Sequence, residues 1–175
     1  MTAAHTLDPQ RTALILVDLM ERIVALPLEP RKGTEVLATA EELARTFRAA
    51  GAPVVLVRVE RPSVAEQPPG SALVPGLAAH GDLEVVKRTI GAFQGTGLDE
   101  RLRERGVTTL VFGGIATNLG VESTARAAAD LGYDLLFAED AMAAFTAAEH
   151  EASVRLDFPR LGTVVTAAAV RLGPA

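Results

Sequence analysis

The stretch over residues 110–124 constrains the fold of this chain more than any other. An apolar run ends in Gly113 and Gly114, and a helical pattern begins near Thr117 and Asn118. A short apolar run bounded by turn residues predicts a buried strand, and the glycine pair predicts a tight turn before a helix. Because such a turn can lift one residue above the edge of a sheet, the stretch predicts an α/β fold with a functional turn over residues 113–120.

The same alternation of apolar runs and amphipathic stretches extends along most of the chain. The apolar runs predict strands over residues 12–17, 53–59, 83–86, 108–113, 134–138 and 162–166. Helical spacing predicts helices over residues 36–50, 98–105, 120–131 and 146–158. This order predicts a three-layer α/β/α, Rossmann-like fold with a mostly parallel sheet of about six strands. We expect one domain over residues 1–175, with its core over residues 12–166.

Three points at the predicted carboxyl ends of strands are candidates for function. Asp18 follows the first strand, Lys87 follows the strand over residues 83–86, and the turn over residues 113–120 follows another. Ligands of open parallel sheets bind beyond the carboxyl ends of the strands. We therefore expect these three points to meet in one pocket. Thr117 and Asn118 could instead serve only as helix caps, although backbone N–H groups at a helix start still favour an anion.

Composition excludes several classes of function. With 175 residues and a net charge of −5, the chain has no basic excess for nucleic acid or an anionic membrane. No apolar run is long enough to span a bilayer and residues 1–10 do not resemble a signal peptide, so we expect a cytoplasmic protein. The lack of cysteine excludes disulfides, thiolate metal sites and a Cys nucleophile. His5, His80 and His150 are expected to be solvated, with the role of His80 left open.

The ordered motifs resemble those of the isochorismatase-like hydrolases, a family within the cysteine hydrolase superfamily. Its members carry an Asp after the first strand, a Lys before a Gly-Ala-Phe-x-Gly-Thr segment, and the glycine turn described above. The resemblance runs from about Thr12 to Val165, nearly the whole chain, and implies a non-proline cis peptide bond between Ile115 and Ala116. The matching segments are Val17–Met20, Lys87–Thr96 and Gly114–Asn118.

The resemblance also implies roles for individual residues. Asp18 is implied as the acid or base, and Lys87 is implied to bind a substrate carboxylate or to stabilise negative charge. Contacts with a small-molecule substrate are implied for Ala116, Thr117, Asn118 and Phe93. Phe93 could instead be a core aromatic.

Gly120 is the main departure from the family pattern. Most members have a nucleophilic Cys at this position, and because glycine has no side chain, an acyl-enzyme route through it is closed. Nicotinamidase-type members bind a metal through an Asp-x-His segment after the second strand. The corresponding Arg58–Arg61 segment contains no His, so we expect no metal and no cofactor. Glu122 is expected to be structural, because the first turn of a helix favours a carboxylate.

Two readings of the reaction remain open at this point. True isochorismatases also have Gly in place of the Cys, and a protonated carboxyl can start vinyl-ether hydrolysis without covalent catalysis. We therefore expect Asp18 and Lys87 to assist water attack on a vinyl ether, an amide or another C–N bond. The alternative is a catalytically inactive, oligomeric member that binds a small molecule. Dinucleotide binding is a weaker possibility, because the glycine spacing departs from G-x-G-x-x-G.

The alanine-rich helices suggest assembly. Residues 121–131 and 141–152 are rich in small apolar side chains, which would allow two helices to approach closely. Members of the family also commonly form closed assemblies. We therefore expect a homodimer or a higher homo-oligomer, with ordinary core packing as the alternative use of the alanines.

Overall fold

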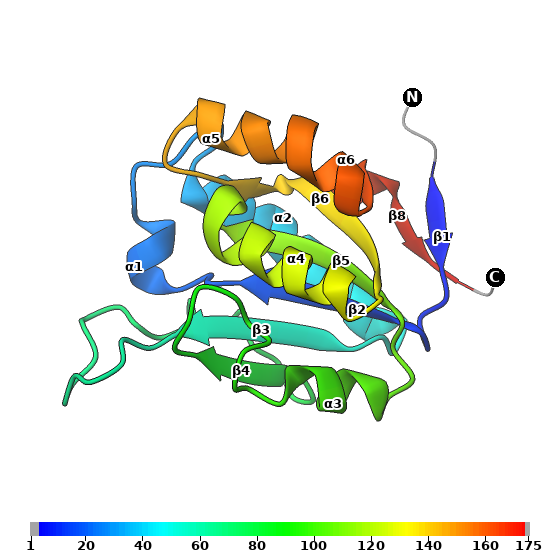
Figure 1. The fold of residues 1–175 in the computed structure, drawn as a ribbon, viewed down its shortest axis with the longest axis horizontal. Helices are drawn as coiled ribbons and strands as arrows, with labels where there is room; N and C mark the ends of the chain where they lie inside the picture. Colours follow the sequence, from blue (N-terminus) through cyan, green and yellow to red (C-terminus); the bar gives the residue numbers. More distant parts are fainter. Residues whose placement is uncertain (1–3, 174–175) are drawn as a thin grey trace.

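A computed structural model describes residues 4–173, and its centre is a sheet of six parallel strands flanked by helices (Figure 1). The strands lie in the order β4–β3–β2–β5–β6–β7. All neighbouring pairs are parallel, which confirms the predicted three-layer α/β/α fold. The strands are β2 (Thr12–Val17), β3 (Val54–Val59), β4 (Leu83–Lys87), β5 (Thr109–Ile115), β6 (Asp134–Ala143) and β7 (Thr163–Val165).

Helices cover both faces of this sheet. One face is covered by α1 (Glu21–Val24) and α2 (Gly33–Ala49), and the other by α3, α4 and the α5–α6 segment. The bounds of the second set are α3 (Leu98–Arg103), α4 (Glu122–Asp130), α5 (Ala147–Ala152) and α6 (Phe158–Leu161). Wide π-helical turns, η1 (Thr117–Val121) and η2 (Ser153–Asp157), lead into α4 and join α5 to α6.

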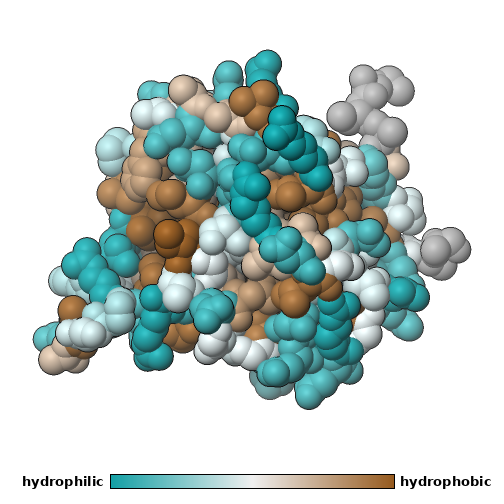
Figure 2. Space-filling view, in the orientation of Figure 1, coloured by the Kyte–Doolittle hydropathy of each residue, from teal (hydrophilic) through white to brown (hydrophobic). Residues whose placement is uncertain are grey.

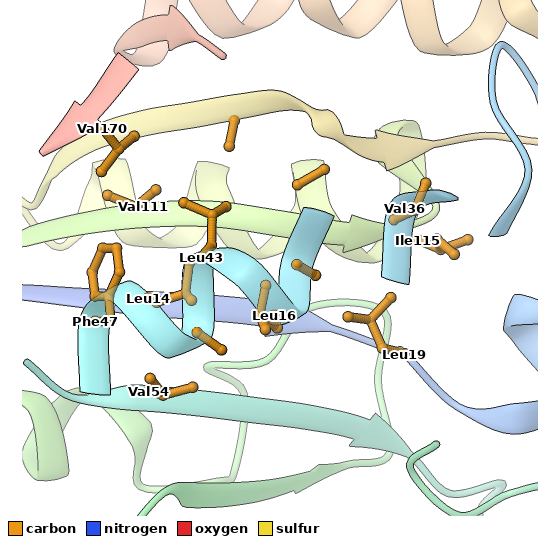
Figure 3. Packing of buried hydrophobic residues seen from close by; sticks show 14 of the residues in the cluster. Leu14, Leu16, Leu19, Val36, Leu43, Phe47, Val54, Val111, Ile115 and Val170 are labelled. Atoms are coloured by element: carbon orange, nitrogen blue, oxygen red, sulfur yellow. The ribbon is translucent and has the colours of Figure 1, made fainter. Parts of the chain in front are cut away.

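The core beneath α2 follows directly from the sequence pattern. Apolar residues recur on α2 at helical spacing, so a single stripe of the helix faces the sheet. Leu43 and Phe47 from this stripe lie over Leu14 and Val54 of the central strands, as Figure 3 shows. Because β2 is buried over its whole length, its run of apolar residues is explained by helices on both sides.

Several elements were not predicted. A separate two-stranded parallel sheet pairs β1 (His5–Leu7) with β8 (Val170–Leu172), which follows a short 3₁₀ turn, η3 (Ala167–Ala169). Strand β6 also runs past its predicted end at Ala138, and its pairing with β5 shifts register between Phe112 and Gly114. Within residues 4–173 no helix combines the length and apolarity needed to cross a bilayer.

The order of the strands defines where a ligand site is expected. After β2 the chain places β3 and β4 on one side, and it then returns to place β5, β6 and β7 on the other. The reversal occurs between β2 and β5, and a crevice opens at such a switch point beyond the carboxyl ends of the strands. Asp18 and the turn after β5 lie at this point.

Candidate functional site

Asp18 and Lys87 meet at the carboxyl edge of the sheet. Lys87 is the last residue of β4, and its Nζ lies 3.0 Å from Oδ2 of Asp18, although β3 lies between their strands. Asp18 has a left-handed backbone, with φ of 54°, which Asp tolerates better than most residues. Its backbone N–H donates to the carbonyl of Val57, 2.8 Å away, and this bond ties the Asp18 backbone to β3.

The environment of this pair changes the chemistry of Asp18. The side chains are 3% exposed for Lys87 and 11% exposed for Asp18. Burial raises the pKa of the Asp18 carboxyl above its ordinary value, against the opposing effect of the Lys87 and Arg22 cations. Oδ1 of Asp18 has no hydrogen-bond partner among the described residues, whereas Oδ2 faces Lys87. Asp18 is therefore a buried carboxyl with a raised proton affinity and one free oxygen.

The turn after β5 brings Gly120 against Asp18. The peptide bond between Ile115 and Ala116 is cis, as the resemblance implied, and the helix begins at the next residue. A Cβ built on Gly120 would lie 3.2 Å from Oδ2 of Asp18 and 3.0 Å from Cγ1 of Val17. The position that would carry a nucleophile therefore faces the Asp18–Lys87 pair, and in this chain it presents only backbone.

A cavity of about 360 Å³ opens in front of these groups. Its lining includes Asp18, Lys87, Gly120 and Ala116, which come from three different strand ends. Apolar side chains form most of the remaining wall, together with the charged groups of Glu60, Arg61 and Arg88. These apolar residues are Ile23, Val59, Pro62, Ile90, Ile115, Leu119 and Phe145.

Three of the sequence-predicted substrate contacts do not line this cavity. Thr117 is fully buried behind the turn, and Asn118 is half-buried with an unpartnered Oδ1 within the described part of the chain. Phe93 lies outside the cavity, where it packs near Tyr133 with 6.0 Å between ring centroids and lines a neighbouring hollow. Phe93 is therefore a partly buried side chain that packs against the core, and it does not line the Asp18 cavity.

His150 was predicted to be a solvated helix residue, and this prediction was wrong. Its side chain is 3% exposed, and Nδ1 lies 2.8 Å from Oγ1 of Thr117. Nε2 lies 3.7 Å from the carboxylate of Glu139, whose Oε2 is also 3.7 Å from Arg31. Burial lowers the pKa of His150, so it is neutral at physiological pH and supports the turn through Thr117.

Other candidates lie away from the cavity. His80 is exposed and lines a hollow at the opposite edge of the sheet. Glu122 accepts hydrogen bonds from Ser153 at 2.6 Å and from Arg126 at 2.9 Å, which fits the structural role expected of it. Over residues 4–173 no three His, Asp or Glu side chains gather closely enough to hold a metal ion.

Comparison with known proteins places the whole chain in one family. A family model described as the isochorismatase domain matches residues 12–169. The isochorismatase family protein YecD of Escherichia coli O157:H7 is 41% identical over 175 residues, which cover 90% of this chain and 93% of that protein.

A solved structure and a shorter match agree with this assignment. An isochorismatase family protein from Burkholderia thailandensis superposes with a TM-score of 0.87 at 38% identity, covering 96% of this chain and 97% of that one. The ureidoacrylate amidohydrolase RutB of Methylobacterium radiotolerans is 55% identical over 56 residues, 31% of this chain and 22% of that protein. This chain therefore belongs to the isochorismatase family of hydrolases.

Proposed function

We propose that this protein hydrolyses a small molecule by activated water, with Asp18 as the acid or base and without a covalent enzyme intermediate. One observation carries the proposal: the Asp18–Lys87 pair, 3.0 Å apart, faces a backbone position, Gly120, that has no side chain. An acyl-enzyme needs a nucleophilic side chain at that point, whereas water attack needs only an acid or base and space for water.

For an amide or other C–N substrate, ionised Asp18 takes a proton from water while the water oxygen bonds to the carbonyl carbon. The C–N bond then breaks, and the proton passes from Asp18 to the leaving nitrogen. Lys87 stabilises the negative charge that develops beside it. The raised pKa of Asp18 suits both steps, since a carboxyl with higher proton affinity is a better base and returns the proton at a pH nearer neutrality.

For a vinyl ether, Asp18 starts in its protonated form and donates the proton to the terminal carbon of the double bond. Water then adds to the resulting oxocarbenium carbon and returns a proton to Asp18, and the hemiketal breaks its C–O bond. A carboxyl held protonated by burial can perform this step without a covalent bond to the enzyme.

Two further features support hydrolysis. The helix that begins at Thr117 starts beside the cavity, and first-turn backbone N–H groups stabilise an oxygen that gains negative charge. The relative RutB is named an amidohydrolase, which favours a C–N bond, and the name of the family favours a vinyl ether.

Turnover of a defined substrate panel tests the proposal. The panel contains carboxamides, ureido compounds and enol ethers, each incubated with wild type, Asp18→Asn and Asp134→Asn. Asp134 is an exposed carboxylate at the start of β6, at the opposite edge of the sheet, so its variant is the matched control. We expect Asp18→Asn to lose about a hundredfold or more in rate and the control to lose nothing. Equal rates for wild type and Asp18→Asn would remove Asp18 from the mechanism.

The second candidate is a catalytically inactive small-molecule-binding protein, and Gly120 is the observation that favours it. This candidate predicts saturable binding of panel members without turnover by the wild type.

The homo-oligomer also stays a proposal. The alanine face of α4 gives it no support, because Ala125 and Ala128 are fully buried within the single chain. Light scattering at micromolar concentration measures the mass directly, and a monomer mass would exclude the assembly.

A further inference from the structure

We propose that the substrate carries an apolar group, aliphatic or aromatic, beside its hydrolysable bond, and that an apolar rim binds this group. The apolar rim consists of Ile90, Leu119 and Phe145, and the inference rests on the proposed function of the same cavity. The three residues come from different elements: the loop after β4, the η1 turn and the segment after β6.

The exposure of these side chains is the first observation. Ile90 is 61% exposed, Leu119 is 44% exposed and Phe145 is 45% exposed. The described residues include six large hydrophobic side chains with this degree of exposure, and half of them line this one cavity. Apolar surface gathers at this end of the molecule, near α1 and the start of the α4 segment, as Figure 2 shows. A cluster of exposed apolar side chains on a protein surface often marks a binding site.

The distribution of polar groups in the cavity is the second observation. The polar groups Asp18 and Lys87 are buried at the carboxyl ends of β2 and β4, whereas the rim is apolar and exposed. At the mouth, Arg88 lies 3.1 Å from the carboxylate of Glu60, so these two charges offset each other, and the third charged group of the lining, Arg61, is exposed to solvent. The cavity therefore offers one polar end for the reacting group and an apolar end for the rest of the molecule.

The size of the cavity limits the ligand. A volume of about 360 Å³ lies at the small end of the range for ligand sites, which suits a molecule with a short chain or one ring. When such a group covers the rim, apolar surface on both partners leaves water, and the affinity rises with each methylene that is buried.

A homologous series of primary amides tests this inference by binding, so the result does not depend on turnover. The probes are acetamide, butyramide, hexanamide and adipamic acid, measured against the wild-type chain by ligand-observed NMR. We expect the dissociation constant to fall about fourfold for each added methylene until the cavity is full. Adipamic acid matches hexanamide in length but ends in a carboxylate, and we expect it to bind more weakly.

Two rim variants and one control locate the effect. Leu119→Ser and Phe145→Ser should each weaken hexanamide binding about tenfold while leaving acetamide unchanged. Leu156→Ser is the matched control, because Leu156 is 62% exposed but lines none of the cavities described above, and it should leave hexanamide binding unchanged. Light scattering on the same samples shows whether a variant has altered assembly.

The outcomes separate this inference from the proposed function. Affinity that does not change along the series, or tighter binding of adipamic acid, would overturn the apolar substrate class even if amides are hydrolysed. The apolar substrate class would also be overturned if the rim variants changed the mass of the assembly in light scattering but not the affinity for hexanamide, since the rim would then be a contact between copies of the chain. Rising affinity without hydrolysis of any amide or enol ether would refute the proposed reaction and keep the rim only as the part of the cavity that binds an apolar group.

Discussion

Removing one member of the Asp18–Lys87 pair should destabilise the fold strongly, whereas replacing both should not. The two side chains are almost fully buried and lie 3.0 Å apart. In Asp18→Asn the Lys87 ammonium loses its negatively charged partner and keeps only neutral acceptors, which include the Thr89 carbonyl, 3.3 Å away. An uncompensated buried charge of this kind costs about 3–5 kcal/mol. For a chain of 175 residues this corresponds to a fall in Tm of about 6–20 °C.

The double variant Asp18→Asn/Lys87→Met should recover most of that loss. Replacing a buried ion pair with uncharged side chains leaves stability about unchanged or raises it by about 1–4 kcal/mol, because neither charge then has to be desolvated.

Urea unfolding followed by circular dichroism measures these effects, since the chain has no tryptophan. Glu151→Gln serves as the control, because it breaks an exposed pair with Arg155 at 3.8 Å and should change stability by less than about 1 kcal/mol. A double variant that loses as much free energy of unfolding as the two single variants combined would refute the reasoning.

Three further predictions concern the wider fold. The pKa of His150 is lower in the folded protein than its unfolded value of 6.5. The free energy of unfolding measured in urea should therefore fall as the pH drops through 6.5, and His150→Gln should reduce this dependence on pH. Burial and a hydrogen bond to Asp99 raise the pKa of Tyr133, the only tyrosine, so an absorbance titration should show no ionisation near pH 10 while the protein stays folded. Gly114→Ala should prevent soluble expression, because φ of Gly114 is +123° and the added Cβ would lie 2.2 Å from a carbonyl oxygen. Gly132→Ala is the control: the Cβ would enter open space, so the free energy of unfolding measured in urea should fall by only about 1–2 kcal/mol.

The fold was predictable because its strands are buried on both faces. A run such as the one over residues 12–17 can be apolar throughout only when helices cover both sides of a strand, and that condition implies a parallel α/β sheet. The meeting of Asp18 and Lys87 follows from the same geometry, since parallel strands end at one edge. The short strands β1 and β8 escaped prediction because three residues give no periodicity to recognise.

The surroundings of the site were harder to predict, because they depend on contacts between distant elements. His150 contacts Thr117 and Glu139, which lie 33 and 11 positions away in the chain. Phe93 belongs to a recognisable motif, yet the loop after β4 turns its ring toward Tyr133 instead of the Asp18 cavity. The one available signal for His150 was the capping box of Thr146 and Glu149, which fixes the start of its helix and thus the face on which it lies.

Single-turnover hydrolysis in H₂¹⁸O tests the central claim most directly, with enzyme in excess over the amide that is hydrolysed fastest in the panel. If Asp18 activates water, the carboxylic acid product carries ¹⁸O in the first turnover, and the intact mass of the protein stays unchanged throughout. If Asp18 instead attacks the substrate, the first product carries unlabelled oxygen from the enzyme, and ¹⁸O appears in the Asp18 carboxyl. An unlabelled first product, or a covalent adduct in the protein mass, would contradict the account.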